Sequence, residues 1–232
     1  MDKNIKEIQS LLIAGGFSVG KSGADGWYGK DTRDALISCI NKANSTGATL
    51  KITLEQLNQI FPTGAKSRNA QFLQPLNDLF ASNGINTVNR VAGFLSQIGV
   101  ESEELLYTRE LGNDAYFNKY DIRFAPQKAK DLGNTQPGDG AKYKGRGLIQ
   151  VTGRANYTAC GKALGLDLVN HPELLEQPKY AVLSAGWYWD MRSINALCDA
   201  DDIVRITKAV NGGTMKLKER TAYYNKAKQV LK

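Results

Sequence analysis

Two glutamates, Glu101 and Glu110, are the residues whose type and spacing best suit chemistry in this chain. Before Glu101, apolar residues recur at the i, i+3, i+4, i+7 spacing of one helix face, at Val91, Phe94, Leu95 and Ile98. Glu101 continues this face, so a carboxylate stands on an apolar stripe. Burial disfavours a charged carboxylate, and a carboxylic acid that keeps its proton near neutral pH can act as a general acid. The alternative is that Glu101 lies at the edge of the stripe and reaches water.

Glu110 follows Glu101 by nine residues. On one straight helix, nine residues turn through roughly 900° and rise about 13.5 Å, so the two side chains would point to opposite faces. They can face one cleft only if the helix ends between them and the chain turns back. The pattern leaves this open, because the first clear helix stop is Gly112-Asn113. Across a gap of about 6.5–9.5 Å, one carboxyl could protonate a leaving glycosidic oxygen while the other activates water.

The composition argues against most other catalytic chemistry. The chain has a single histidine, His171, whereas zinc hydrolases and Ser-His-Asp or Cys-His sites need placed histidines. His171 precedes Pro172, which is typical of a loop that enters a helix. The three cysteines, at positions 39, 160 and 198, show neither metal spacing nor a disulfide framework, and we expect them to be reduced. We therefore expect carboxylate chemistry, without a metal or a cofactor.

The net charge of +7 indicates an anionic partner, either nucleic acid or the bacterial wall and envelope. No nucleic-acid motif and no dense basic run with interleaved aromatics is found, so we do not expect nucleic-acid binding. No apolar run reaches 18 residues, and the first six residues lack the apolar region of a signal peptide. We therefore expect synthesis in the cytoplasm and no stable membrane insertion.

The elements that must position the glutamates are predicted to be mainly helical. Periodicity and capping residues predict helices at 4–14, from about 30, 54–60, 69–82, from 87 into the Glu101 stripe, 156–164, 172–177, 179–191, 201–210 and 218–231. After Glu110, Gly and Pro predict a loop of around thirty residues with one helical turn near 127–131. A short extended stretch follows at 143–153. A small polar stretch at 44–50 is a predicted linker between domains at 1–43 and 51–232.

Three stretches resemble glycoside hydrolase family 19, in particular its phage-endolysin branch close to the chitinases. These stretches are residues 94–102, 132–140 and 143–157. The C-terminal part of the family is matched by residues 211–213 and 220–224. The resemblance covers residues 51–232. It implies a lysozyme-like α-helical catalytic domain with a short β-hairpin.

The resemblance also implies roles for individual residues. Glu101 would be the general acid and Glu110 the general base of an inverting hydrolysis, and Thr152 would help to hold the attacking water. The implied substrate-binding residues are Tyr143, Gln150, Asn156, Asn211 and Arg220, the last matching an Arg that orients or charge-compensates the carboxylates. The family often has His directly before the acid, where this chain has Val100.

The residues themselves leave other interpretations open for several of these positions. Gln150 and Thr152 could be the wet face of a strand, because they alternate with Ile149 and Val151. Asn211 could be a helix C-cap and Arg220 an exposed helix residue. Glu103 and Glu104 are interpreted as solvated charges.

The N-terminal segment resembles the peptidoglycan-binding domain type 1. The resemblance rests on residues 5–12 and on the run from Asp25 to Leu36, with its Asp-Gly turn followed by Trp27 and Tyr28. It implies that Asp25, Trp27 and Tyr28 contact the wall. Trp27 could instead fill the core of this small unit.

These observations predict a monomeric endolysin that hydrolyses β-1,4 bonds of bacterial peptidoglycan, as a muramidase, during host lysis. Its partners would be glycan strands and stem peptides. It would wait in the host cytoplasm until a holin-type pore released it to the wall. Two alternatives remain, a chitinase acting on N-acetylglucosamine polymers and a non-catalytic wall-binding protein.

Overall fold

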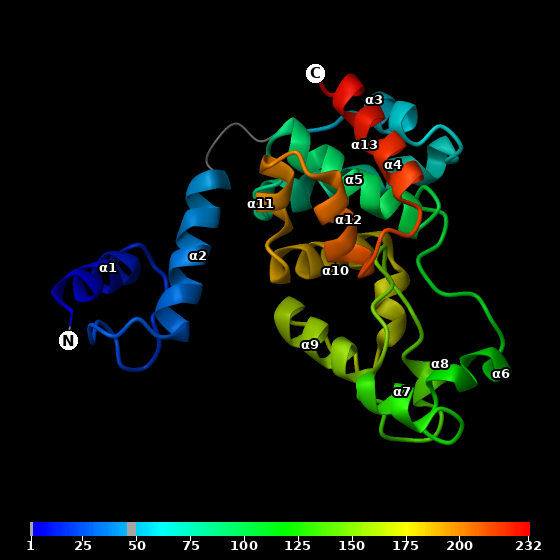
Figure 1. The fold of residues 1–232 in the computed structure, drawn as a ribbon, viewed down its shortest axis with the longest axis horizontal. Helices are drawn as coiled ribbons and strands as arrows, with labels where there is room; N and C mark the ends of the chain where they lie inside the picture. Colours follow the sequence, from blue (N-terminus) through cyan, green and yellow to red (C-terminus); the bar gives the residue numbers. More distant parts are fainter. Residues whose placement is uncertain (1, 46–49) are drawn as a thin grey trace.

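The structure, a computed structural model, describes residues 2–45 and 50–232, and it is built almost entirely of helices (Figure 1). In chain order these are α1 Lys3–Ala14, α2 Lys30–Ser45, α3 Leu54–Ile60, α4 Lys66–Ser82, α5 Val88–Glu101, α6 Asp114–Phe117, η1 Asn118–Tyr120, α7 Pro126–Asp131, α8 Asp139–Lys142, α9 Arg154–Leu164, η2 Pro172–Glu176, α10 Pro178–Met191, α11 Ile194–Asp199, α12 Ile203–Asn211 and α13 Leu217–Val230. The predicted mainly helical fold is confirmed. The short α11 was not predicted.

Helix α5 forms the centre of the main hydrophobic core. Thr87 caps its first turn, and the ten residues from Val91 to Val100 are all buried. Phe94 packs edge-on against both Phe80 and Trp189. Helices α11, α12 and α13 pack against α5 (Figure 1), and α10 contacts it through Trp189. Because α5 is enclosed on most of its surface, its C-terminal residue, Glu101, is held on a rigid support.

Two glycines let neighbouring groups approach α5 closely. A Cβ atom on Gly99 would lie 2.6 Å from Cε1 of Phe61, and one on Gly93 would lie 2.5 Å from Sγ of Cys198. Both neighbours are fully buried. Glycine at these positions therefore serves packing around the helix rather than helix formation.

The segment between Glu110 and Tyr143 is more ordered than the sequence predicts. The expected turn near 127–131 is present as α7, and α6, η1 and α8 add further short helices (Figure 1). Asp121 accepts a hydrogen bond from the Gly138 backbone N–H, and Asp139 is ion-paired with Arg154. These buried carboxylates hold the segment together by bonds to backbone and guanidinium groups, which periodicity does not reveal.

The expected β-hairpin is present only as two isolated antiparallel bridges. In the described residues, Arg146 pairs with Arg109 on one side and with Val151 on the other. Gln150 takes a left-handed conformation with φ of 57°, which interrupts the alternation of a strand. The stretch at 143–153 is therefore a tight turn and not an extended strand.

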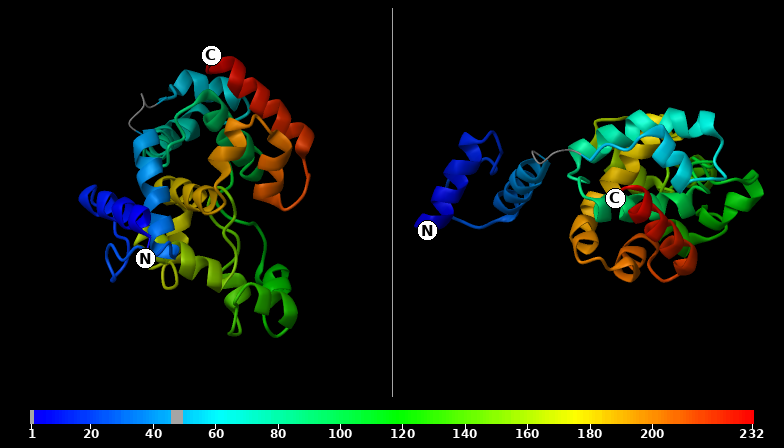
Figure 2. Two further views of the ribbon diagram at one scale, coloured as in Figure 1. Left: turned by 60° about the vertical axis from the view of Figure 1, so that its left-hand side comes forward. Right: turned by 90° about the horizontal axis from the view of Figure 1, so that it is seen from above.

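At the N-terminal end, α1 and α2 pack together as a pair (Figure 2) around a small cluster of Leu12, Val19 and Ala35. Both helices lie where the sequence predicts them. The predicted linker at 44–50 falls mostly on residues 46–49, outside the described residues, and the domain boundaries stay a prediction. Among the helices of the described residues, none combines the length and apolar character needed to cross a membrane.

Candidate active site

Glu101 is the last residue of α5, and the chain reverses directly after it. Ser102 forms the C-cap, and the next three residues, Glu103, Glu104 and Leu105, all take left-handed conformations with φ of 48°, 55° and 67°. Such a run is costly for residues other than glycine and needs firm support from its surroundings. The helix therefore ends between the two glutamates, which is the condition for them to face one cleft.

A buried guanidinium pairs with the Glu101 carboxylate. Nη2 of Arg220 donates to Oε1 of Glu101 at 2.5 Å, and Nη1 donates to Oε1 of Gln97 at 2.7 Å. Arg220 is only 1% exposed, so it is not a surface arginine of α13. The Glu101 side chain is 22% exposed. The apolar stripe is thus only part of its environment, and a charged partner fixes its orientation.

Glu110 has different partners. Its Oε1 accepts hydrogen bonds from Nζ of Lys119 at 2.9 Å and from the Tyr120 hydroxyl at 3.1 Å, and its Oε2 accepts from the Gly145 N–H at 3.3 Å. Burial acts to raise the pKa of Glu110, but the bonds from Lys119 and Gly145 outweigh it and hold the pKa below the ordinary value. Glu110 is therefore kept ionised, as a general base must be.

Gly145 brings Glu110 next to Gln150 and Thr152. The backbone N–H of Glu110 donates to the Gly145 carbonyl at 2.8 Å. A Cβ atom on Gly145 would lie 2.6 Å from Oε1 of Gln150 and 3.3 Å from Oγ1 of Thr152. The Thr152 hydroxyl donates to the Gln150 carbonyl at 2.9 Å, so its lone pairs remain available to a water molecule. Glu110 is thus bonded to Gly145 of the turn that also carries Thr152.

The turn at 143–153 is connected to Glu101 through residues of α10. Gln150, Thr152 and Asn156 line a pocket of about 140 Å³ together with Trp187 and Tyr188 of α10. Burial raises the pKa of the Tyr188 phenol, and the negative charge of nearby Glu101 adds to this rise. The structure therefore gathers three of the predicted site residues, Gln150, Thr152 and Asn156, around one hollow, and Glu101 lies near Tyr188 in its wall.

The remaining predicted site residues have different outcomes. Asn156 donates to the Thr152 carbonyl at 2.8 Å from an exposed position. Asn211 is the last residue of α12, with Gly212 as its C-cap, and its substrate role stays a prediction. Tyr143 is fully buried and donates to the Val169 carbonyl at 3.0 Å. The expectation that Tyr143 contacts substrate is wrong, because its ring belongs to a hydrophobic cluster.

Sequence reasoning missed several supporting residues. Gln97 is fully buried in α5, and its place as a polar residue inside an apolar helix was an available signal. Lys119 and Tyr120 hold Glu110 from the segment that was predicted to be mostly loop. Glu104 was interpreted as a solvated charge, yet it is 3% exposed and accepts four hydrogen bonds. Those bonds come from distant segments, which a local pattern cannot indicate.

Other expectations of the sequence concern histidine and cysteine. His171 lies directly before the short helix η2, with Pro172 in its first turn, as predicted. The three cysteines are free, and burial raises the pKa of the Cys160 and Cys198 thiols to about 12. Across residues 2–45 and 50–232, no group of three or more His, Cys, Asp or Glu is placed to hold a metal ion.

The helical fold and the pair of separately supported carboxylates define a glycoside hydrolase of lysozyme-like architecture. Residues 78–216 match the family model described as chitinase class I. A glycosyl hydrolase family 19 domain-containing protein of Haemophilus influenzae is 30% identical over 198 residues, which cover 76% of this chain and 95% of that protein. The chain belongs to glycoside hydrolase family 19.

Solved structures and plant relatives agree with this placement. The crystal structure of chitinase C from Streptomyces griseus matches with a TM-score of 0.63 and 26% identity, covering 80% of this chain and 95% of that one. A second bacterial family 19 chitinase matches with a TM-score of 0.59. An endochitinase of Arabidopsis thaliana is 28% identical over 83% of this chain, which spans 62% of the plant protein.

Proposed function

We propose that this chain hydrolyses β-1,4 glycosidic bonds of bacterial peptidoglycan with inversion, as a muramidase-type endolysin. Glu101 donates a proton to the leaving glycosidic oxygen, and Arg220 holds its carboxyl group in place. Glu110 removes a proton from the attacking water, which Thr152 helps to position. The observation that carries this mechanism is the different support of the two carboxylates, one paired with a buried guanidinium and the other held ionised by Lys119, Tyr120 and Gly145.

Peptidoglycan is favoured as substrate by features outside the catalytic pair. The chain carries a net charge of +7, which suits the anionic wall. Trp27 and Tyr28 are 70% and 54% exposed, so neither fills the core of the N-terminal unit. Asp25 shapes their loop, since its Oδ1 accepts from the Trp27 N–H and from Nε2 of Gln9, both at 2.9 Å. We infer that Trp27 and Tyr28 contact wall polymer.

The phage context belongs to the same proposal. An endolysin made in the host cytoplasm would reach the wall after a holin-type pore opens the inner membrane. The basic charge would then favour retention on the wall after release. Lysis of a host from within, with and without a co-expressed holin, tests this part separately.

Mass spectrometry of digested, purified peptidoglycan tests the substrate and the bond. Muramidase action leaves muramic acid at the new reducing end, and NMR of the fresh product reports whether the anomeric configuration inverts. Chitin is digested in parallel, because chitinase is the second candidate and the relatives named above include endochitinases. Release of sugar from chitin alone would overturn the peptidoglycan proposal.

Replacing the proposed acid separates an enzyme from a non-catalytic wall-binding protein. E101Q keeps the size of the side chain but cannot donate the proton, so we expect hydrolysis to fall by roughly 10²–10⁴-fold. Binding to sacculi should remain. Glu173 of η2 has a side chain that is 59% exposed, and E173Q is the matched control. Hydrolysis by E101Q at the rate of E173Q would contradict the assignment of the acid.

A further inference from the structure

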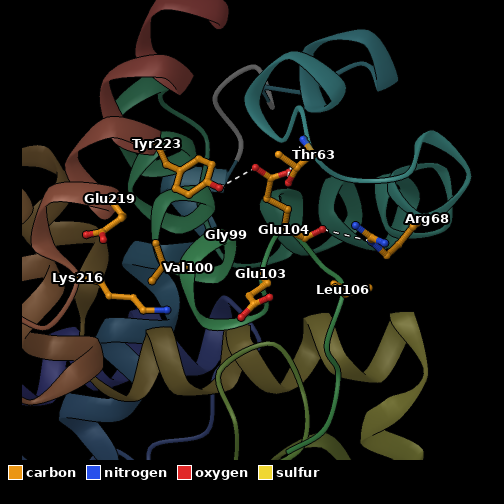
Figure 3. Close-up of a pocket in the computed structure, with 10 residues that line it drawn as sticks. All are labelled: Thr63, Arg68, Gly99, Val100, Glu103, Glu104, Leu106, Lys216, Glu219 and Tyr223. Atoms are coloured by element: carbon orange, nitrogen blue, oxygen red, sulfur yellow. Dashed lines mark hydrogen bonds between the residues drawn. The ribbon is translucent and has the colours of Figure 1, made fainter. Parts of the chain in front are cut away.

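A second pocket lies beside the end of α5, on the turn that follows Glu101 (Figure 3). Its volume of about 320 Å³ is within the range of small-ligand sites. It is lined by residues of three stretches of the chain, 63–68, 99–106 and 216–223. Neither Glu101 nor Glu110 lines it, and the proposed catalytic steps do not use it.

The wall of this pocket is rigid because Glu104 is fully engaged. Oε2 of Glu104 accepts from the backbone N–H groups of Thr63 and Gly64 at 2.8 and 2.7 Å and from the Thr63 hydroxyl at 2.6 Å. Oε1 accepts from the Tyr223 hydroxyl at 2.6 Å. Figure 3 shows the Glu104 carboxylate turned toward Tyr223 and Thr63. Glu104 is therefore a structural support here and has no free capacity for a ligand.

The rim of the pocket carries charges of both signs that the protein does not use. Glu103, Lys216 and Glu219 are exposed, and within the described part of the chain no hydrogen bond or ion pair engages their side chains. In the view of Figure 3, the Lys216 ammonium lies between the carboxylates of Glu219 and Glu103. Val100 and Leu106 add apolar surface. A ligand that suits this lining has both amine and carboxylate groups on a partly apolar chain.

The pocket is built from the same elements that place the acid. Val100 directly precedes Glu101, and Glu219 directly precedes Arg220, the partner of Glu101. The pocket and the proposed acid therefore share the end of α5 and the start of α13, so a ligand of the pocket would lie near the acid. Chitin carries only uncharged N-acetyl groups, whereas the peptides of peptidoglycan carry free amine and carboxylate groups.

We propose that this pocket binds the stem peptide of a muramic acid residue next to the cleaved bond, a step that rests on the proposed peptidoglycan activity. Glu103 and Glu219 pair with the free amine of the diamino acid, and Lys216 pairs with a peptide carboxylate. The pocket then selects glycan that still bears peptides over bare glycan.

Two substrates test this selection. The full-length chain, the E103Q/E219Q double variant, K216Q and the control E173Q are assayed on intact peptidoglycan and on glycan strands stripped of peptides by an amidase. We expect kcat/KM of the double variant and of K216Q to fall by roughly 10- to 100-fold on intact peptidoglycan, the factor of one or two charge-assisted hydrogen bonds. On stripped strands all four proteins should act alike. Equal losses on both substrates, or no loss on either, would overturn the proposal.

Binding of the free peptide tests the assignment of the pocket separately from the enzyme activity. A free stem tetrapeptide with its diamino acid is titrated into the labelled full-length protein and followed by NMR. We expect shifts for Glu103, Leu106 and Lys216 in the wild type, and the shifts of Leu106 and Lys216 should be lost in the double variant. A chain that cleaves only chitin would refute the proposed function. Absence of peptide shifts at these residues would refute the pocket assignment, whichever polymer is cleaved.

Discussion

Glu101 and Glu110 carry the same functional group, and their neighbours support them differently. The side chain of Glu101 is fixed by one guanidinium that is itself buried and bonded to Gln97. Glu110 is fixed by three donors from two segments, Lys119 and Tyr120 of η1 and Gly145 of the turn at 143–153. Loss of any one donor should therefore affect Glu110 gradually, whereas loss of the guanidinium would leave Glu101 without its charged partner.

In the proposed mechanism, Lys119 helps to set the pH range in which Glu110 acts as a base. Its ammonium donates to Glu110 and contributes to the lowered pKa of that carboxyl. K119M removes both the hydrogen bond and the charge, so the pKa of Glu110 rises. Because the base must be ionised, the acidic limb of the kcat/KM profile should move to higher pH, with activity lost first at low pH and retained near neutrality.

The measurement is a pH–rate profile of wild type and K119M on one soluble oligosaccharide. K128M in α7 is the control, since Lys128 lies in a neighbouring short helix and has no bond to Glu110 in the described residues. The lowered pKa of Glu110 also contributes to the stability of the fold. This contribution is present above the pKa of Glu110 in the unfolded chain and is lost as the pH falls through its pKa in the folded chain. We expect the contribution to be smaller in K119M. An unmoved acidic limb would mean that Lys119 does not tune the base.

At the scale of elements, the sequence predicted where helices lie far better than what joins them. The stripe from Val91 to Ile98 and the cap at Thr87 identified α5 because both signals are local. The reversal after Glu101 was not predictable in this way, since its left-handed residues are not glycines and are held by contacts from α3–α4 and α13. Tyr143 was misassigned for a related reason, because a motif match cannot show that a ring faces the core.

The bond between Tyr223 and Glu104 joins α13 to the turn after α5, and α13 also carries Arg220. Y223F keeps the ring against Phe61 but leaves Oε1 of Glu104 buried without a donor. We expect the free energy of unfolding to fall by about 1–3 kcal/mol, the cost of one unpaired buried acceptor. Urea denaturation followed by circular dichroism measures this change.

Tyr107 offers the matched control for Y223F. Its hydroxyl makes no side-chain hydrogen bond in the part of the chain that the structure describes, so Y107F should change the free energy of unfolding by less than about 0.5 kcal/mol. If Y223F is no less stable than Y107F, the bond from Tyr223 to Glu104 does not stabilise the fold. The rigid wall of the second pocket, beside the end of α5, then loses one of its supports.

For the whole molecule, the proposed function assigns wall attachment and bond cleavage to different parts of the chain. The main core and the active site lie within residues 50–232, while Trp27 and Tyr28 belong to the unit formed by α1 and α2. A polymer that is insoluble and anionic favours this arrangement, because a weak contact at one end raises the local concentration of substrate at the other. The gain should appear on whole sacculi and vanish on short soluble substrates.

This difference can be tested with a single aromatic residue. Trp27 is 70% exposed and Leu11 of α1 is 67% exposed, so replacing either with alanine removes an exposed apolar side chain from the same unit. We expect W27A to reduce retention on purified sacculi by roughly five- to 100-fold, about the value of one aromatic contact with a sugar or peptide group, while L11A changes it little. Both variants should hydrolyse soluble oligosaccharides at the wild-type rate, because neither residue lines the pocket that holds Gln150 and Thr152. Equal retention of W27A and L11A in a sedimentation assay would place wall attachment elsewhere on the chain.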